Sequence, residues 1–318
     1  MQCNVCSRKC ELAPGDFGYC CVYFNDAGKL VNRFQNKIST LAIEPIEKRP
    51  FFHFCAGTKF LSIGTMGCQL SCDFCQNSRV SQELVANCKD LTPQMIVSLA
   101  ELKGANGIAF TYNEPTIHPE YILEVAKQSP LPVAVKTNGY STAEWMSRLC
   151  EHVDAWNVDI KGNDATYLRM EAKVWRIWRN MTRILAAGRH LEVSYLVTPE
   201  MVDRWDFHKL LSTAINKFEK FYHRPVPIHL LYCYPVYRQT ESYPPERLLE
   251  IAAIFQKRVQ HVYISNHHGT PFVKFRNTVC PQCHEVLVER GKEVVVKKQE
   301  CCGIPLYNTC AKGEGYAH

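Results

Sequence analysis

The chain has 318 residues and is 46% hydrophobic, which suits one large domain with appendages or two ordinary domains. Its net charge of +6 is spread over 37 basic and 31 acidic residues, with only a short basic run at 297–298, so the charge gives no support for nucleic-acid binding. We expect a cytoplasmic protein, because no apolar run of about 18 residues could span a membrane and the first residues lack the apolar core of a secretory signal.

The cysteines are the most unusual feature of the composition. There are 17, and most of them gather at 3–21, 68–75 and 280–310. In a reducing compartment such groups indicate ligands for metals or clusters before they indicate disulfides. We therefore divide the chain into a Cys-rich N-terminal extension (1–55), a central domain (56–278) and a Cys-rich, ribbon-like C-terminal extension (279–318).

The N-terminal extension contains four thiols that can act as one ligand set. Sets of this kind close around zinc, a single iron or a second iron–sulfur cluster. We expect zinc or iron with a structural role, because so short a segment has little core of its own and a metal would stabilise its fold directly. Four unmetallated thiols are the alternative. The four residues are Cys3, Cys6, Cys10 and Cys20.

The central domain alternates β-rich runs with segments of helical period. The strands are too apolar to have a solvent face, which indicates a parallel sheet covered by helices: an α/β fold with a partial or full (βα) barrel. Thr92 before Pro93 predicts a helix start, and Ser141 with Glu144 predicts a capping box. Function in such a barrel belongs at the carboxyl ends of the strands. The predicted strands are 59–63, 107–112, 132–137, 155–160, 191–197, 228–234 and 261–265, and the predicted helices are 93–103, 117–128, 142–151, 171–187, 206–218 and 245–258.

The stretch GTMGCQLSCDFCQN (64–77) places Cys68, Cys72 and Cys75 directly after the first predicted strand. A 4Fe-4S cluster offers four irons, each usually bound by a Cys thiolate, so three thiolates leave one iron open for another ligand. The short spacing lets one loop hold three corners of such a cluster. Two alternatives are three buried thiols that only pack and a zinc ion with a fourth ligand from elsewhere.

This CxxxCxxC motif, with Phe74 before its last cysteine, resembles the signature of the radical S-adenosylmethionine (SAM) superfamily. Over essentially the whole chain, the sequence resembles the radical SAM enzyme of the AmmeMemoRadiSam system, a group similar to the pyruvate formate-lyase activating enzymes. The resemblance implies a TIM-like radical SAM barrel in which SAM itself completes the ligands of the 4Fe-4S cluster. The segments that carry it are CNVCSRKC (3–10), EPIEKRPFFHF (44–54), LSIGTMGCQLSCDFCQN (61–77), IAFTYNEPT (108–116), VKTNGY (135–140) and DAWNVDIKG (154–162).

The same resemblance implies that Asn113 and Glu114, at the end of the second predicted strand, bind the amino group of the methionine moiety of SAM. A carboxylate and carbonyl groups held there can accept hydrogen bonds from an ammonium. The alternative is an ordinary turn with a solvated glutamate.

Residues at the next two strand ends are also implied in SAM binding. Asp159 and Lys161 match an Asp-Leu-Lys motif that lines the cofactor pocket, and strand alternation puts both on one face. Thr137, Asn138 and Phe74 would border the cofactor. The alternative for Asp159 and Lys161 is an internal ion pair. The alternative for Thr137 and Asn138 is an ordinary turn formed by Asn138 and Gly139.

Several histidines on or after the later strands are candidates for contact with the substrate. They are His229 and the run Asn266-His267-His268. Histidines on apolar strands are more often satisfied core residues, which is the alternative for all of them.

The C-terminal extension begins with a CxxC pair and contains three more cysteines. The related family usually closes this ribbon with a second CxxC-Gly, but the expected cysteine position here holds Gln299. Cys301 or Cys310 would then substitute, and our predicted zinc or iron ligands are Cys280, Cys283, Cys302 and Cys310. The isolated cysteines are expected to be structural: Cys55, Cys88, Cys150 and Cys233.

The resemblance implies an enzyme that cleaves SAM reductively and removes a hydrogen atom from a substrate. Its implied partners are a one-electron reductant of the flavodoxin or ferredoxin type and Memo-like and AMMECR-like proteins. One alternative is an activating enzyme that takes hydrogen from a backbone glycine of a glycyl-radical enzyme. Another is a non-catalytic zinc and iron–sulfur protein for electron transfer or docking, which predicts that Asn113, Glu114, Asp159 and Lys161 do not converge on the triplet loop.

Overall fold

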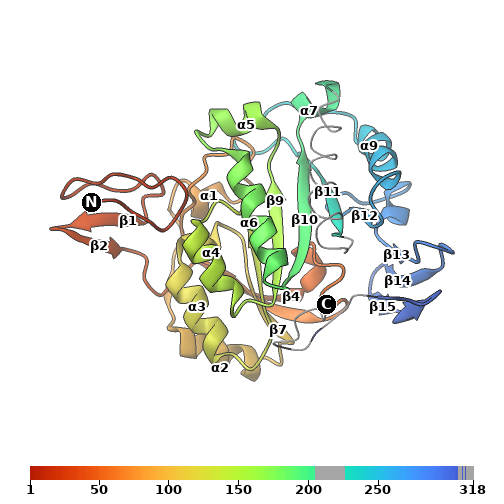
Figure 1. Cartoon of the computed structure of the whole chain (residues 1–318), viewed down its shortest axis with the longest axis horizontal. Coiled ribbons are helices and arrows are strands. Elements are labelled where there is room, and N and C mark those ends of the chain that lie inside the picture. Colours follow the sequence, from red (N-terminus) through yellow and green to blue (C-terminus); the bar gives the residue numbers. More distant parts are fainter. Residues whose placement is uncertain (205–225, 307–309, 311, 313–318) are drawn as a thin grey trace.

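The computed structural model describes residues 1–204, 226–306, 310 and 312. Its centre is an eight-stranded sheet in which seven strands are parallel and β4 pairs antiparallel with β5 at one edge (Figure 1). The seven parallel strands are those predicted, so the α/β fold is confirmed. Within the described residues β4 and β12 are the two edge strands, and they do not pair with each other. The sheet is therefore an open, partial barrel. In order across the sheet the strands are β12 (Val262–Ile264), β11 (Ile228–Tyr232), β10 (His190–Val197), β9 (Ala155–Ile160), β8 (Val133–Thr137), β7 (Gly107–Phe110), β5 (Lys59–Gly64) and β4 (Thr40–Pro45).

The helices pack mainly on the outer face of this sheet (Figure 1). Thr92 caps α2 as predicted, since its side chain accepts from the N–H of Met95. The predicted capping box is wrong: Thr142, not Ser141, caps α4 and accepts from Trp145 N–H. The predicted helix 206–218 lies outside the described residues. The helices are α1 (Ser78–Ser81), α2 (Pro93–Leu102), α3 (Pro119–Gln128), α4 (Ala143–Cys150), α5 (Asp164–Arg169), α6 (Val174–Ala186), α7 (Pro199–Arg204) and α9 (Arg247–Gln256), with 3-10 turns η1 (Ile46–Lys48), η2 (Pro115–Ile117) and η3 (Phe272–Phe275).

The alternation of side chains along each strand separates an apolar outer face from a polar inner face. In β9, Trp156, Val158 and Ile160 join the main apolar core, whereas Asn157 and Asp159 point to the other side and bond to Lys136 of β8. A period of two residues has this effect in any strand. The polar side chains Asn157 and Asp159 of β9 therefore lie on the inner face of the sheet.

Segment 50–55 fills the inner face of the sheet beneath those polar groups. Phe51 and Phe54 are buried there against three alanines, one each from β7, β8 and β9. Small side chains on these strands leave the room that the two aromatic rings occupy. The extension 1–55 is thus joined to the central domain through β4 and this segment. The three alanines are Ala109, Ala134 and Ala155.

The two Cys-rich ends lie at opposite sides of the molecule (Figure 1). The N-terminal end carries the β1–β2 hairpin, and the C-terminal end carries a three-stranded antiparallel sheet and a short hairpin. Every helix among the described residues is too short or too polar to cross a membrane. The strands concerned are β1 (Tyr23–Asp26), β2 (Lys29–Asn32), β13 (Thr278–Val279), β14 (Val286–Arg290), β15 (Val294–Val296), β16 (Glu300–Cys301) and β17 (Ile304–Pro305), and β3 (Lys37–Ile38) pairs separately with β6 (Lys89–Asp90).

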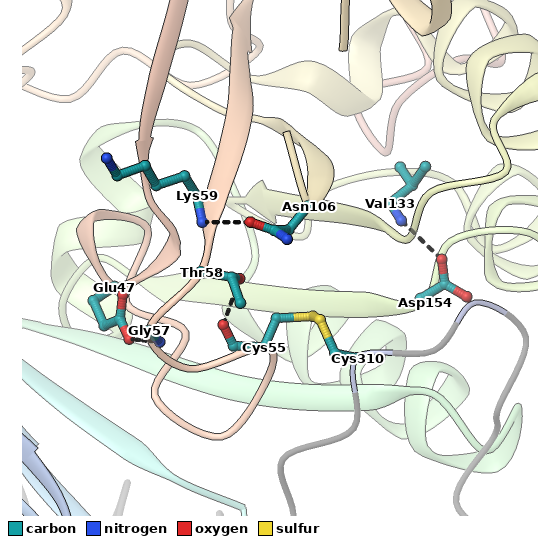
Figure 2. Close-up of a disulfide and its surroundings, with 9 residues drawn as sticks. All are labelled: Glu47, Cys55, Gly57, Thr58, Lys59, Asn106, Val133, Asp154 and Cys310. Atoms are coloured by element: carbon teal, nitrogen blue, oxygen red, sulfur yellow. Dashed lines mark hydrogen bonds between the residues drawn. A yellow bond between two sulfur atoms is a disulfide. The ribbon is translucent and has the colours of Figure 1, made fainter. Parts of the chain in front are cut away.

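Cys310 forms a disulfide with Cys55, as Figure 2 shows. This corrects the prediction that Cys310 binds a metal, because a sulfur in a disulfide has no thiolate to offer. The bond joins residues 255 positions apart, and it ties the C-terminal residues to the buried segment 50–55.

Candidate active site

A cavity of about 240 Å³ opens at the carboxyl ends of the parallel strands. The loop after β5 contributes the sulfur-bearing residues Cys68, Cys72 and Cys75 to its lining. The other predicted cofactor residues line the same cavity, so the structure brings all of them together, as the position of strand ends in a barrel leads one to expect. These residues are Phe74, Asn113, Glu114, Thr137, Asn138, Asp159 and Lys161.

Asn113 fixes the start of the triplet loop. Its Oδ1 accepts from the N–H of Thr65 at 3.0 Å, and its Nδ2 donates to the carbonyl of Gly67 at 2.9 Å. Gly67 has a φ of +86°, and an added Cβ there would strike Val22, so glycine is required. The side-chain amide of Asn113 is therefore engaged with the protein, and its role in the structure is to position the loop.

Glu114 is buried, and its carboxylate joins the ends of β7 and β8. Oε1 accepts from Thr116 N–H, from Thr116 Oγ1 and from Thr137 Oγ1 at 2.6–2.9 Å, and Oε2 accepts from Asn138 N–H at 2.7 Å. Burial raises the pKa of Glu114, although these hydrogen bonds favour its charged form. Since a carboxylate oxygen accepts about two hydrogen bonds, Oε2 keeps one position for a ligand.

Asn138 links the end of β8 to the first cysteine of the triplet. Its Nδ2 donates to Cys68 Sγ at 3.6 Å and to Gln69 Oε1 at 3.3 Å, while its Oδ1 accepts from Gln69 Nε2 at 3.2 Å. Hydrogen bonds to cluster sulfurs are one means by which proteins set cluster potentials. Asn138 is thus placed to act on the electronic properties of a metal bound at Cys68.

Asp159 accepts from two ammonium groups inside the cavity. Lys136 Nζ lies 2.6 Å from Oδ1, and Lys161 Nζ lies 3.0 Å from Oδ2. Burial alone would raise the pKa of Asp159, but Lys136 and Lys161 outweigh it and lower the pKa. Burial lowers the pKa of Lys136, while Asp159 raises that of Lys161 against the effect of burial. The ion pair that was the alternative to SAM binding at this position is therefore present, and its residues also line the cavity.

The two lysines differ in the donors that they keep. Lys136 Nζ donates to Asp159, Asn157 and Ser194, which uses its three N–H groups. Among the described residues, the partner of Lys161 Nζ is Asp159. Lys161 therefore has donors left for a ligand carboxylate or hydroxyl.

Two of the three thiols, Cys68 and Cys75, are only partly buried, and all three line the cavity. Burial raises the pKa of Cys72 to about 12 and that of Cys68 well above its usual range, so these two thiols are neutral unless a bound cation holds them as thiolates. Cys233 also lines the cavity, but it follows β11, on the far side of the sheet from the loop after β5. The loop itself thus offers three thiols, and a cluster held by them would take its fourth ligand from elsewhere.

Other cavity residues were not among the predicted site residues. Arg49 reaches the wall from the extension, where it donates to Tyr112 Oη at 2.9 Å and pairs with Glu44. Tyr232 ends β11, and its position at a strand end could have indicated it; Tyr234 follows it into the cavity wall. The position of Arg49 in the cavity wall could not be predicted from the sequence, because it depends on a contact with Tyr112, which is distant in the chain.

His229 is a satisfied core residue and does not line the cavity. Its Nε2–H donates to Glu192 Oε2 at 2.6 Å, and its Nδ1 pairs with Ser265 Oγ at 2.6 Å. Burial lowers the pKa of His229, which keeps the ring neutral, whereas hydrogen bonds from His190 and His229 hold the pKa of Glu192 well below its usual range despite burial.

The residues after β12 divide between the cavity and its surroundings. Asn266 lines the cavity and bonds with its side chain to the backbone of Tyr232. His267 Nδ1 pairs with Tyr234 Oη at 2.9 Å, and His268 is exposed; neither lines the cavity.

The four predicted N-terminal ligands gather in one small core. Cys3 and Cys6 are buried in it, and Cys10 and Cys20 pack against it. A Cβ added at Gly18 would lie 3.9 Å from Cys10 Sγ and 4.0 Å from Cys20 Sγ, so these two sulfurs flank one point. Burial raises the pKa of Cys3 to about 11 and that of Cys6 to about 12, which a bound cation would reverse.

The C-terminal extension holds a compact group of thiols. The sulfurs of Cys280, Cys283, Cys301 and Cys302 all lie within 4.8 Å of one another. Two come from the turn between β13 and β14 and two from the β16–β17 hairpin, an arrangement typical of zinc ribbons. Cys301 therefore takes the place predicted for Cys310.

Two sequence comparisons relate this chain to known proteins. The family model of the Radical SAM superfamily matches residues 62–212, which include the triplet and all the cofactor residues discussed above. The uncharacterized protein MJ0808 of Methanocaldococcus jannaschii is 31% identical over 322 residues, which cover 95% of this chain and 94% of that protein.

The similarity to solved structures is weaker. A domain of pyruvate-formate lyase-activating enzyme from Bacteroides vulgatus is 17% identical, with a TM-score of 0.43 over 50% of this chain and 99% of that one. A radical SAM methyltransferase from Sphaerobacter thermophilus is 14% identical, with a TM-score of 0.48 over 71% of this chain and 70% of that one. Streptococcus suis SuiB bound to S-adenosylmethionine is 12% identical, with a TM-score of 0.49 over 72% of this chain and 54% of that one.

Proposed function

Because the chain belongs to the radical SAM superfamily, we propose that it is an enzyme that holds a 4Fe-4S cluster on Cys68, Cys72 and Cys75 and cleaves SAM reductively. The observation that carries the proposal is the convergence of these thiols with Glu114 and Lys161 on one cavity. When bound, the cluster and SAM supply a one-electron cleavage of the sulfonium, which gives methionine and a 5'-deoxyadenosyl radical that removes hydrogen from the substrate.

The chain's own residues would hold the methionine moiety of SAM by its two charged groups. Glu114 Oε2 has one acceptor position left for an ammonium, and Lys161 Nζ has donors left for a carboxylate. Charge-assisted hydrogen bonds of this kind are stronger than neutral ones. Asn113 would act indirectly in this scheme, because its amide is occupied in holding the loop at Thr65 and Gly67.

The convergence speaks against the non-catalytic alternative. A protein for electron transfer or docking has no reason to direct Glu114, Asp159 and Lys161 into the cavity of its cluster loop, yet all three line it. The finer assignment, to the radical SAM enzyme of the AmmeMemoRadiSam system, is part of the proposal. So is a cytoplasmic location.

The experiment that tests the proposal compares two cysteines of the same cavity. Protein reconstituted anaerobically with iron and sulfide is reduced with dithionite, and its electron paramagnetic resonance spectrum is recorded with and without SAM. We expect SAM to change the signal of the wild type and of Cys233→Ala, and we expect Cys72→Ala to lack the signal. A reducible cluster whose spectrum does not respond to SAM would favour the electron-transfer alternative.

A further inference from the structure

The triplet loop has two sides, and only one of them faces the cavity. Cys68, Leu70 and Cys72 line the cavity. The two residues between them contact the N-terminal extension instead: Arg8 Nε donates to the carbonyl of Gln69 at 2.6 Å, and Tyr19 Oη donates to Ser71 Oγ at 2.7 Å. The N-terminal extension therefore covers the loop on the side away from the cavity.

Arg8 and Tyr19 form a short connection from that loop to the surface. The Arg8 guanidinium lies 3.4 Å above the centroid of the Tyr19 ring, which is 41% exposed. Both residues line a shallow hollow of about 290 Å³ together with Cys10, Lys173 and Arg176. The hollow thus lies between the N-terminal cysteines and the start of α6, directly behind the triplet loop.

The surface beside this hollow is basic and has an aromatic centre. Trp175 is 46% exposed, and the guanidinium groups of Arg176 and Arg179 lie 5.2 Å and 5.6 Å from its ring. Lys173 and Arg179 are exposed, and α6 contains no acidic residue. Glu171 is the acidic residue at the hollow, and it pairs with Arg8 at 3.5 Å. We name Lys173, Trp175, Arg176 and Arg179 the basic face; the Arg8 side chain is only 8% exposed and is not part of it.

We propose that the basic face is the docking surface of an acidic one-electron donor protein. In the encounter, a reduced flavin of the donor would lose one electron, and an oxidised cluster held by Cys68, Cys72 and Cys75 would accept it. Complementary charge steers such short-lived complexes and raises their association rate, and transient redox interfaces are small. A donor bound here leaves the cavity open to SAM and substrate, because it reaches the loop from the other side.

This inference rests on the proposed function, since it assigns the electron source for the same cluster. The connection to the loop favours a redox protein over a nucleic acid as the occupant. A phosphate backbone would need a longer track of cations than the few side chains gathered here.

The test uses flavodoxin, an acidic protein, and a charge-reversal pair. Lys173→Glu with Arg179→Glu changes two exposed members of the basic face that are outside the cavity. The matched control, Lys103→Glu with Lys292→Glu, makes the same change of charge at two exposed sites, after α2 and between β14 and β15. Titration calorimetry at low salt gives the Kd of oxidised flavodoxin, and SAM cleavage is measured with reduced flavodoxin and, separately, with dithionite.

We expect the reversal at 173 and 179 to weaken flavodoxin binding about tenfold, since each exposed charge pair contributes a modest amount. The flavodoxin-driven rate should fall with it, while the dithionite-driven rate and the control variant stay unchanged. An unchanged Kd, or no binding by the wild type, overturns the inference. A reversal that abolishes binding of a single-stranded RNA probe but not of flavodoxin also overturns it. Loss of dithionite-driven cleavage in the wild type would instead contradict the proposed function, and the binding measurement would still test the surface.

Discussion

The side-chain amide of Asn138 donates to the sulfur of Cys68 over 3.6 Å, which connects the end of β8 to the first thiol of the triplet. The same residue is held from behind, because its backbone N–H donates to the buried carboxylate of Glu114 at 2.7 Å. A donor with its own position fixed in this way keeps its direction toward the sulfur. Asn138 therefore combines a contact with a proposed cluster ligand and a rigid attachment to the barrel.

Replacing Asn138 by leucine should lower the reduction potential of the cluster. The substitution keeps the volume but removes the N–H donor to Cys68, and fewer hydrogen bonds to sulfur stabilise the reduced cluster less. SAM cleavage should slow roughly 10- to 100-fold, as is common when an outer ligand contact is lost. A redox titration followed by electron paramagnetic resonance measures the potential. Asn106→Leu, at the opposite ends of the strands, is the control (Figure 2), and equal potentials in the two variants would contradict the assignment.

Replacing Asp159 by asparagine should affect both stability and SAM binding. It leaves the partly buried ammonium groups of Lys136 and Lys161 without their carboxylate, which should cost roughly 1–3 kcal/mol. Urea unfolding of the metal-free protein measures that loss. Equilibrium dialysis should show SAM affinity falling about tenfold or more at unchanged iron content, because Lys161 loses its orientation. An unchanged SAM affinity would show that this ion pair has no part in cofactor binding.

The stability of the fold should fall in mild acid through His118. Its ring is buried, Nε2–H donates to Met66 O at 2.7 Å, and Nδ1 accepts from Asn32 Nδ2 at 3.0 Å. Burial lowers the pKa of His118 from 6.5 to about 4. Between these values the unfolded chain binds a proton that the folded chain does not, so the free energy of unfolding decreases as pH falls, by about 3 kcal/mol in total.

The measurement for His118 is urea unfolding at intervals from pH 7 to pH 4. His118→Gln keeps a donor for Met66 but cannot titrate, so its stability should change less over that range. If the wild type and the variant lose stability in parallel, the neutral ring of His118 is not the cause.

The C-terminal thiols allow a matched comparison of two neighbouring cysteines. Cys301 lies in the compact group of four sulfurs, whereas Cys310 is bonded to Cys55. We expect Cys301→Ser to lose about one zinc per chain, by elemental analysis, and Cys310→Ser to keep it. If Cys310→Ser lost the zinc and Cys301→Ser kept it, Cys310 would be the ligand, as the sequence predicted.

The sequence predicted the parallel strands well because their apolar runs and strand ends are local features. The side chains at those ends meet because parallel strands share one carboxyl edge, so the strand-end positions and the family resemblance together predicted Glu114 and Asp159 at the site. Their contacts were harder to predict. Nothing near Asn113 in the chain indicates that its amide holds Thr65 and Gly67, since that choice depends on the distance between two loops.

The failures were likewise non-local or finely balanced. The Cys55–Cys310 disulfide joins residues 255 positions apart, so no spacing pattern reveals it. The capping box failed by one residue because Thr142 has the same capping chemistry as Ser141. Neither the pairing of β4 with β5 nor the packing of segment 50–55 on the sheet was predicted, because both depend on contacts with strands elsewhere in the chain.

The central claim is that the triplet loop supports reductive cleavage of SAM, and its most direct test is the product. Reconstituted protein is incubated without oxygen with dithionite and SAM, and 5'-deoxyadenosine is measured by mass spectrometry. The account predicts that it forms in the wild type and in Cys233→Ala and is absent in Cys72→Ala. Absence from wild-type protein with an intact, reducible cluster, or equal formation by Cys72→Ala, would contradict it.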